Sequence, residues 1–305
     1  KNSKGGLVNY GNGRGLISNN VLAKNSGQNI GGGIQLTNPI YVDVINNTST
    51  LNSGGTNAFA LQILNNGANV KVLNNSLQVS ATSTTAYAGF FSNTTAGTIV
   101  NNNIFSNIGG GPSLFVNNPG LYTADYNMLF TTGATLTRVS TPANTNYANL
   151  QAWQSAWNWD ASSLVYRPSF VSNNDLRPNV SDPNSWAMNG RGLQTKGNNY
   201  DFNNTYRPDS LTAGVPDFGA YEFYPTVAPI VLTAIPATPA PNTQQTFMLG
   251  TDTVMKIRWA ASVPPSIEVR RFSGDVPRGL LQPRPDSMFF YTKVDMPVPA
   301  NFGYE

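Results

Sequence analysis

The sequence contains neither cysteine nor histidine among its 305 residues. Without these residues there is no Cys–His or Ser–His–Asp nucleophile system, no thiolate or imidazole zinc site, and no haem or iron–sulfur ligation of the common kinds. Disulfide bonds are excluded too, so an extracellular location would have to be sustained without them. The two absences thus exclude these nucleophile, metal and cofactor sites.

Charged residues are also scarce. They make up 11% of the chain, less than half the share of about 25% in ordinary globular proteins, and the formal net charge is only +3. No stripe interleaves basic and aromatic residues, which argues against a nucleic-acid partner. No apolar run reaches 18 residues, so no membrane span is expected. Residues 1–10 resemble the middle of a repeat, and we expect the chain to be a segment of a longer polypeptide.

Pairs of asparagines recur at a nearly constant spacing. The second members of four pairs are 27, 28 and 28 residues apart, at Asn20, Asn47, Asn75 and Asn103. Apolar residues precede each pair, and a second apolar segment follows in the same phase, for example Leu61–Leu64. Short β-rich segments broken by Gly and Asn at a fixed period are typical of a parallel β-solenoid with two or three strands per turn.

The paired asparagines are interpreted as corners of this coil. Asparagine tolerates the left-handed backbone conformation, and its amide can bond to copies of itself in the turns above and below. A structural role for Asn20, Asn47, Asn75 and Asn103 is therefore favoured over a ligand-binding row. An antiparallel sandwich would turn every 8–12 residues without long-range phase, and a leucine-rich repeat would need a recurring helix.

A series of short motifs follows the repeats. In order they are Leu150-Gln151-Ala152-Trp153, Asp160-Ala161-Ser162-Ser163, Arg167-Pro168-Ser169-Phe170, Asn174-Asp175-Leu176-Arg177 and Pro216-Asp217-Phe218-Gly219-Ala220-Tyr221-Glu222-Phe223. With these motifs the chain resembles right-handed parallel β-helix proteins of the pectate-lyase-like class, as found in secreted proteins of gliding, polysaccharide-degrading bacteria. The resemblance implies right-handed β-helix turns over residues 1–130 and terminal turns with a cap over 131–225. It also implies export, often by the type 9 secretion route.

The last 80 residues differ from the repeats in composition and in their pattern of apolar residues. The Pro-rich segment 226–242 predicts a stiff linker. Beyond it, apolar and polar residues alternate in four segments, which predicts an antiparallel sandwich over residues 243–305: Gln245–Leu249, Val254–Ala260, Ile267–Phe272 and Met288–Val294. This part weakly resembles the Ig-like modules of long bacterial surface proteins. The expected fold class is all-β, namely a right-handed parallel β-helix with a C-terminal cap, followed by a small Ig-like β-sandwich.

The repeats carry little catalytic chemistry. Residues 1–130 contain two acids, Asp43 and Asp125, about three turns and therefore roughly 14 Å apart along a solenoid axis. That separation exceeds the window of about 5–9.5 Å between glycosidase carboxylates. Lys71 could act as a base, but its alternation with Val72 indicates a solvated outward position. We therefore assign no catalytic residue. The alternative is a polysaccharide lyase or glycosidase whose active cleft lies partly outside this segment.

Binding residues are expected after the repeats. Trp157, Trp159 and Tyr200 could stack on sugar rings, or else pack over the end of the coil. Asp201, Asn203 and Asp217 supply the oxygen ligands that Ca²⁺ prefers, although no twelve-residue calcium loop is present. Beyond this possible Ca²⁺, no cofactor is expected.

Three Asp-Ser/Thr-apolar triplets resemble the O-glycosylation triplet of secreted proteins from these bacteria, with acceptors at Ser210, Thr253 and Ser287. Together these observations predict a non-catalytic segment of a large secreted or outer cell-surface protein, a structural or adhesive rod that binds glycans. Its expected partners are surface polysaccharide, other cell-surface proteins or the secretion machinery.

Overall fold

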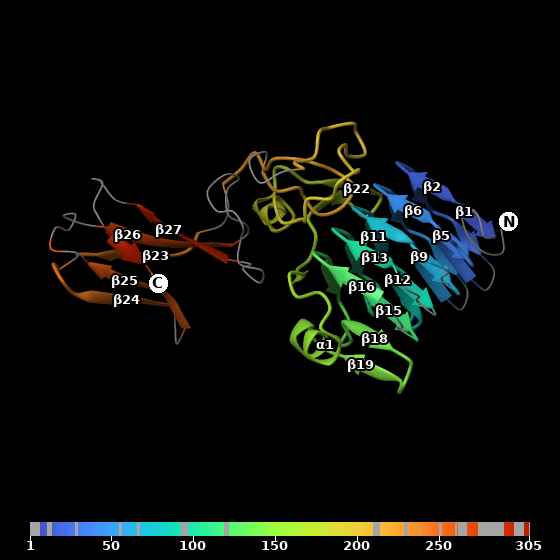
Figure 1. Cartoon of the computed structure of the whole chain (residues 1–305), viewed down its shortest axis with the longest axis horizontal. Coiled ribbons are helices and arrows are strands. Elements are labelled where there is room, and N and C mark those ends of the chain that lie inside the picture. The colour runs from blue at the N-terminus through green and yellow to red at the C-terminus, as the bar shows by residue number, and fades with distance from the viewer. Residues whose placement is uncertain are drawn as a thin grey trace.

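A computed structural model describes most of the chain. The described residues are 7–10, 14–27, 30–54, 57–65, 68–92, 97–118, 122–209, 214–228, 231–238, 240–249, 252–259, 261, 267–273, 290–295 and 302–304. Their N-terminal part is a parallel β-solenoid of about four turns, which confirms that prediction (Figure 1). Each complete turn contributes one strand to each of three sheets.

Sheet A consists, in spatial order, of β1 (Leu7–Tyr10), β5 (Ile30–Thr37), β9 (Asn57–Leu64), β12 (Ala86–Ser92), β15 (Leu114–Asn117), β18 (Thr137–Val139) and β19 (Thr145–Tyr147). Sheet B consists of β2 (Gly15–Ser18), β6 (Val42–Ile45), β10 (Lys71–Leu73), β13 (Thr98–Asn101) and β16 (Tyr122–Asp125). Sheet C consists of β3 (Val21–Ala23), β7 (Thr48–Thr50), β11 (Ser76–Val79), β14 (Ile104–Asn107), β17 (Met128–Thr131) and β20 (Leu164–Val165). The short strands β4 (Ser26–Gly27) and β8 (Ser53–Gly54) pair separately. All these pairs are parallel except β18 with β19.

The core is a set of columns of equivalent residues. In sheet B the pairing register places Val44, Val72, Val100 and Ala124 next to one another, and all four are buried. Parallel strands lie about 4.8 Å apart, so equivalent apolar side chains stack directly along the axis. The 28-residue period therefore produces a continuous hydrophobic core from short strands that could not bury an apolar face alone.

The helix α1 (Leu150–Trp157) lies beside β18 and β19 at one end of the coil (Figure 1). The side chain of Asn149 caps its N-terminus, and Asn158 ends it with φ = 54°. Trp153, on the inner face of α1, is fully buried in the core of the coil. None of the helices in the described ranges is both long and apolar enough to span a membrane.

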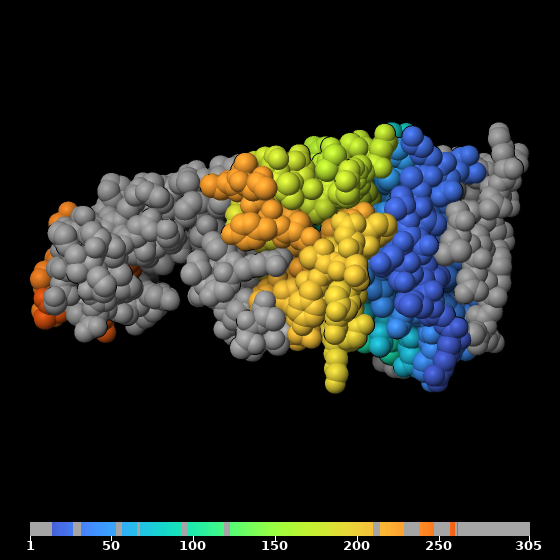
Figure 2. All heavy atoms as spheres, turned by 90° about the horizontal axis from the view of Figure 1, so that it is seen from above, coloured from blue at the N-terminus to red at the C-terminus, as the bar shows by residue number. Residues whose placement is uncertain are grey.

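Residues 166–228, here called the return segment, run back along the side of the coil. This segment contains β21 (Phe170–Ser172), β22 (Asp175–Pro178) and the 3-10 helix η1 (Pro183–Ala187). Figure 2 shows its yellow part lying against the blue early turns. Thr50 donates from Oγ1 to the carbonyl of Asn173 at 2.6 Å, and Asn19 donates from Nδ2 to the carbonyl of Phe202 at 3.3 Å.

The return segment and sheet C share a second apolar cluster, formed by Ile104, Met128, Leu164, Ala187, Met188 and Phe218. The sequence predicts terminal turns and a cap over residues 131–225, and these bounds stay a prediction. In the structure the return segment lies along the flank of the coil, where polar side chains at one corner bind it, as described below.

The C-terminal residues form two antiparallel three-stranded sheets. One contains β23 (Val231–Ala237), β26 (Ile267–Ser273) and β27 (Phe290–Asp295), and the other β24 (Gln244–Leu249), β25 (Asp252–Trp259) and β28 (Phe302–Tyr304). Strand β23 falls within the predicted linker 226–242. It can contain Pro236 because it is an edge strand, where a missing backbone N–H is tolerated. The Ig-like identity of this part stays a prediction.

Candidate functional site

The two members of each asparagine pair have different roles. The first members adopt the left-handed conformation, with φ of 54°, 54°, 52° and 61° at Asn19, Asn46, Asn74 and Asn102. The second members stack in one column at Asn20, Asn47, Asn75 and Asn103, of which Asn20 is exposed and the other three are fully buried. In each step the backbone N–H and the Nδ2 of one asparagine both donate to the Oδ1 of the next, at 2.9–3.1 Å.

We call this column of asparagines the inner ladder. It continues beyond the four predicted corners. Asn103 donates to Asn127 in the same way, and Asn127 donates from Nδ2 to Oδ1 of Asp160 at 3.0 Å. Asp160 is fully buried and also accepts from the indole Nε1 of Trp153 at 2.8 Å and from Ser163 at 2.6 Å. Burial raises the pKa of Asp160, although these hydrogen bonds act in the opposite direction.

The first members of the pairs bind the return segment. Asn46 donates to the carbonyl of Tyr200 at 2.7 Å. Asn102 both donates to the carbonyl of Leu193 and accepts from its N–H, each at 2.7 Å. Asn74 donates to the carbonyl of Asp217 at 3.2 Å. One corner of the solenoid thus positions a long irregular segment against the flank of the coil.

The predicted calcium ligands lie within this segment as structural groups. Both oxygens of Asp201 accept backbone N–H donors, including that of Glu222 at 2.8 Å. Both oxygens of Asp217 accept as well, from Gly190 and Phe223 among others. Asn203 is exposed.

Over the described ranges, no group of three or more acidic side chains is arranged as metal ligands. The Ca²⁺ site stays a prediction.

The predicted aromatic residues lie in two separate places. Trp157 and Trp159 stack on each other, with ring centroids 5.0 Å apart and planes 13° apart, and both pack against the core at the α1 end. Tyr200 is 53% exposed and contacts Tyr206 edge to face on the flank. Tyr200 lies beside Asn46, the neighbour of Asn47 in the inner ladder. Four steps of the ladder separate Asn47 from Asp160 at the α1 end, so the two aromatic sites are far apart.

Of the predicted glycosylation acceptors, Thr253 lies in β25, whereas Ser210 and Ser287 fall outside the described residues.

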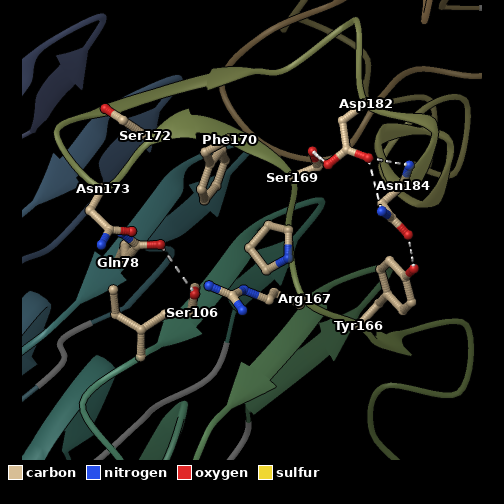
Figure 3. Close-up of a pocket in the computed structure, with 12 residues that line it drawn as sticks. Gln78, Ser106, Tyr166, Arg167, Ser169, Phe170, Ser172, Asn173, Asp182 and Asn184 are labelled. Carbon is tan, nitrogen blue, oxygen red and sulfur yellow. Dashed lines mark hydrogen bonds between the residues drawn. The ribbon is translucent and has the colours of Figure 1, made fainter. Parts of the chain in front are cut away.

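A polar cleft lies between the outer face of sheet C and the return segment. It has a volume of about 460 Å³ and is lined by Gln78, Ser106, Ile108, Tyr166, Arg167, Pro168, Ser169, Phe170, Ser172, Asn173, Asp182 and Asn184 (Figure 3). Its floor is formed by adjacent strands of the coil, because Gln78 on β11 and Ser106 on β14 are direct neighbours in the register. Ser106 donates to Oε1 of Gln78 at 3.4 Å.

The carboxylate in the cleft is held by its own neighbours. Asp182 accepts from Ser169 Oγ at 2.5 Å and from the backbone N–H and Nδ2 of Asn184 at 2.9 and 2.8 Å. Burial alone would raise the pKa of Asp182, but these hydrogen bonds outweigh it and hold the pKa below its usual value. Asp182 is therefore ionised and fixed in orientation at neutral pH.

Arg167 supplies the positive charge of the cleft. Its side chain is exposed and points toward Ser106 and Gln78 on the floor (Figure 3). Within the described ranges, no hydrogen bond or ion pair engages its guanidinium, and none joins it to Asp182. The cleft thus holds an available cation and a fixed anion, with amides and hydroxyls between them.

The cleft could not be predicted from the sequence. The motif Arg167-Pro168-Ser169-Phe170, which carries part of the family resemblance, supplies four of the lining residues. No spacing in the sequence connects it with Gln78 or Ser106, which come from repeats 61 or more residues earlier. Their proximity depends on the return of the chain along the coil.

The cleft contains a single acidic side chain among its described lining residues. Glycoside cleavage uses a pair of carboxylates flanking the bond, and among the described residues that line the cleft Asp182 is the one acid.

Comparison of the chain with models of known protein families found no match, and neither did comparison with curated proteins or with solved structures.

Proposed function

We infer that this chain is a non-catalytic segment of a large secreted or outer cell-surface protein. In this proposal the solenoid is a structural and adhesive rod, and the polar cleft beside Arg167 binds glycans. Surface polysaccharide, other cell-surface proteins and the secretion machinery are the proposed partners. The observation that carries the proposal is a polar cleft built on a rigid solenoid wall.

The rigidity of the floor supports this function. Gln78 and Ser106 belong to strands whose alternate residues, Leu77, Val79 and Phe105, are buried in the core of the coil. The inner ladder fixes the corner from which these strands start. Such a site loses little conformational freedom when it binds a ligand, so more of the interaction energy appears as affinity.

The lining also matches a polyhydroxylated ligand. The amides of Asn173 and Asn184 and the hydroxyl of Ser172 can donate and accept hydrogen bonds. Phe170 and Tyr166 add aromatic surface for the apolar face of a sugar ring. A volume of about 460 Å³ falls within the usual range of about 300–1,000 Å³ for small-molecule sites.

The remaining parts of the proposal depend on the sequence. The motif order described above supports the right-handed winding, the pectate-lyase-like class and export by the type 9 route. The alternation of apolar and polar residues over 243–305 supports the Ig-like module. The stacked pair Trp157 and Trp159 and the exposed Tyr200 stay proposed glycan contacts outside the cleft.

The test is binding of the purified chain to an array of bacterial and algal oligosaccharides, followed by titration calorimetry on those retained. Asn173→Trp fills the cleft from an exposed position and is expected to weaken binding at least about tenfold. The matched control is Asn174→Trp, at the exposed neighbouring asparagine that does not line the cleft. Absence of binding, or equal binding by both variants, contradicts the proposal.

A further inference from the structure

The two charges of the cleft carry a more specific inference, which depends on the proposed function. We propose that the cleft selects a saccharide in which a ring with one negative group adjoins a ring with neutral hydroxyls. Arg167 pairs with the negative group, and Asp182 accepts hydrogen bonds from the hydroxyls of the neighbouring ring. The negative group is a carboxylate or a sulfate ester, since a guanidinium binds both oxyanions through paired N–H donors.

The position of Arg167 is the first reason. The guanidinium is solvent-accessible, points over the floor of the cleft and has no partner among the described residues. The exposed ion pair of Arg177 with Asp175 shows the contrast, because there a guanidinium on the same segment is already bound to a carboxylate at 2.5 Å. Arg167 retains its full capacity to bind an anion from outside.

The state of Asp182 is the second reason. Its Oδ1 accepts two bonds from Asn184, whereas its Oδ2 accepts one, from Ser169, and retains capacity for another donor. A sugar hydroxyl can supply that donor. A second anionic group cannot, and it would be repelled by a carboxylate that stays ionised.

Arg167 and Asp182 together determine which ring of the ligand can carry a negative charge. A neutral glycan would leave Arg167 without a counter-charge, and a polymer charged on every ring would place a negative group near Asp182. The ligand that satisfies both ends alternates charged and neutral rings, or carries one charged ring at its end.

Titration calorimetry can test this with three oligosaccharides of equal length, which are neutral, charged on one ring and charged on every ring. We expect the singly charged ligand to bind at least about tenfold more tightly than either of the others. Paired ligands with a carboxylate or a sulfate ester on the charged ring then distinguish the two sources of the anion.

Substitutions at Arg167 and Asp182 test whether these residues cause the charge selection. Arg167→Ala is expected to reduce the affinity for the singly charged ligand to that of the neutral one, and Arg167→Lys to restore part of the loss. Asp182→Asn is expected to raise the affinity for the fully charged ligand, with the melting temperature measured to confirm that the fold is kept. Arg177→Ala, outside the cleft, serves as the control and is expected to change none of the three affinities.

The outcomes separate this inference from the proposed function. Equal binding of neutral and singly charged ligands, unchanged in Arg167→Ala, would overturn the charge selection and leave glycan binding intact. Tightest binding of the fully charged ligand, unaffected by Asp182→Asn, would overturn the role of Asp182. Binding of no oligosaccharide would overturn both proposals.

Discussion

The indole N–H of Trp153 donates a 2.8 Å hydrogen bond to Oδ2 of Asp160. Oδ1 of the same carboxylate accepts from Asn127, the last asparagine of the inner ladder. Asp160 therefore connects helix α1 to the inner ladder of asparagines at the corner of the coil. Asn127, Trp153 and Asp160 are all buried, so the connection is protected from competing water.

Asp160→Asn is expected to destabilise the protein by roughly 1–3 kcal/mol. An asparagine can keep the bond from Asn127 at its Oδ1, but its Nδ2 then faces the indole N–H of Trp153, and two donors oppose each other. Urea unfolding monitored by tryptophan fluorescence measures the loss. Asp209→Asn, at an exposed carboxylate, is the control, and equal stability of the two variants would contradict the role assigned to Asp160.

The stability contributed by Asp160 should depend on pH. Burial is the largest influence and raises the pKa of Asp160, so the folded state binds a proton more readily than the unfolded state. Between the unfolded value near 3.9 and the folded pKa, the free energy of unfolding therefore falls as the pH rises. The stability of the wild type relative to Asp160→Asn is expected to increase on acidification through this window. A decrease would reverse the assigned sign.

Asn75→Ala is expected to lower the free energy of unfolding by at least about 3 kcal/mol. The fully buried amide accepts two bonds from Asn47 and donates to the carbonyls of Val44 and Leu73 and to Asn103. Truncation removes all five of these hydrogen bonds from a buried site. Chemical denaturation provides the measurement. Asn203→Ala, at an exposed asparagine, is expected to change little.

Breaking the buried ion pair between Arg207 and Glu222 is expected to cost about 3–5 kcal/mol. Both side chains are nearly inaccessible to solvent, and Arg207 also donates to Asn46 on the coil. Arg207→Met and Glu222→Gln should therefore loosen the return segment, which hydrogen exchange over residues 190–222 can detect. In Arg177→Ala, which removes an exposed ion pair, exchange over the same residues should be unchanged. Equal protection in all three variants would refute the prediction.

Gly33→Ala is expected to destabilise the protein by about 1–3 kcal/mol. A Cβ at this position would lie 2.6 Å from the carbonyl oxygen of Ala60 and 1.9 Å from Oγ of Ser49. The backbone oxygen cannot move without breaking the register of sheet A. Gly15→Ala is the matched control, because its nearest neighbour would be a methyl of Val42 at 3.9 Å. Thermal unfolding of the two variants distinguishes them, and similar melting temperatures would contradict the argument.

The sequence supported the solenoid because its signal is periodic. Apolar residues around Val44, Val72 and Val100 recur with the asparagine pairs, and a constant period requires equivalent residues to stack. The same reasoning predicted a corner role for the pairs but did not separate Asn46 from Asn47. Which of two adjacent asparagines turns outward depends on the backbone conformation of the corner. Because the two residues are of the same type, the sequence cannot distinguish them.

The positions of the return segment and the cleft could not be predicted from the periodicity. Arg167, Asp182 and Gln78 belong to parts of the chain with no shared period, so no pattern could indicate that they meet. The sequence by itself determined the coil, because a repeated apolar and amide pattern is satisfied by local stacking of each turn on the last. Only the tertiary structure decided where the non-repetitive residues lie, since their positions depend on hydrogen bonds and apolar contacts between segments more than 90 residues apart, such as Asn102 with Leu193.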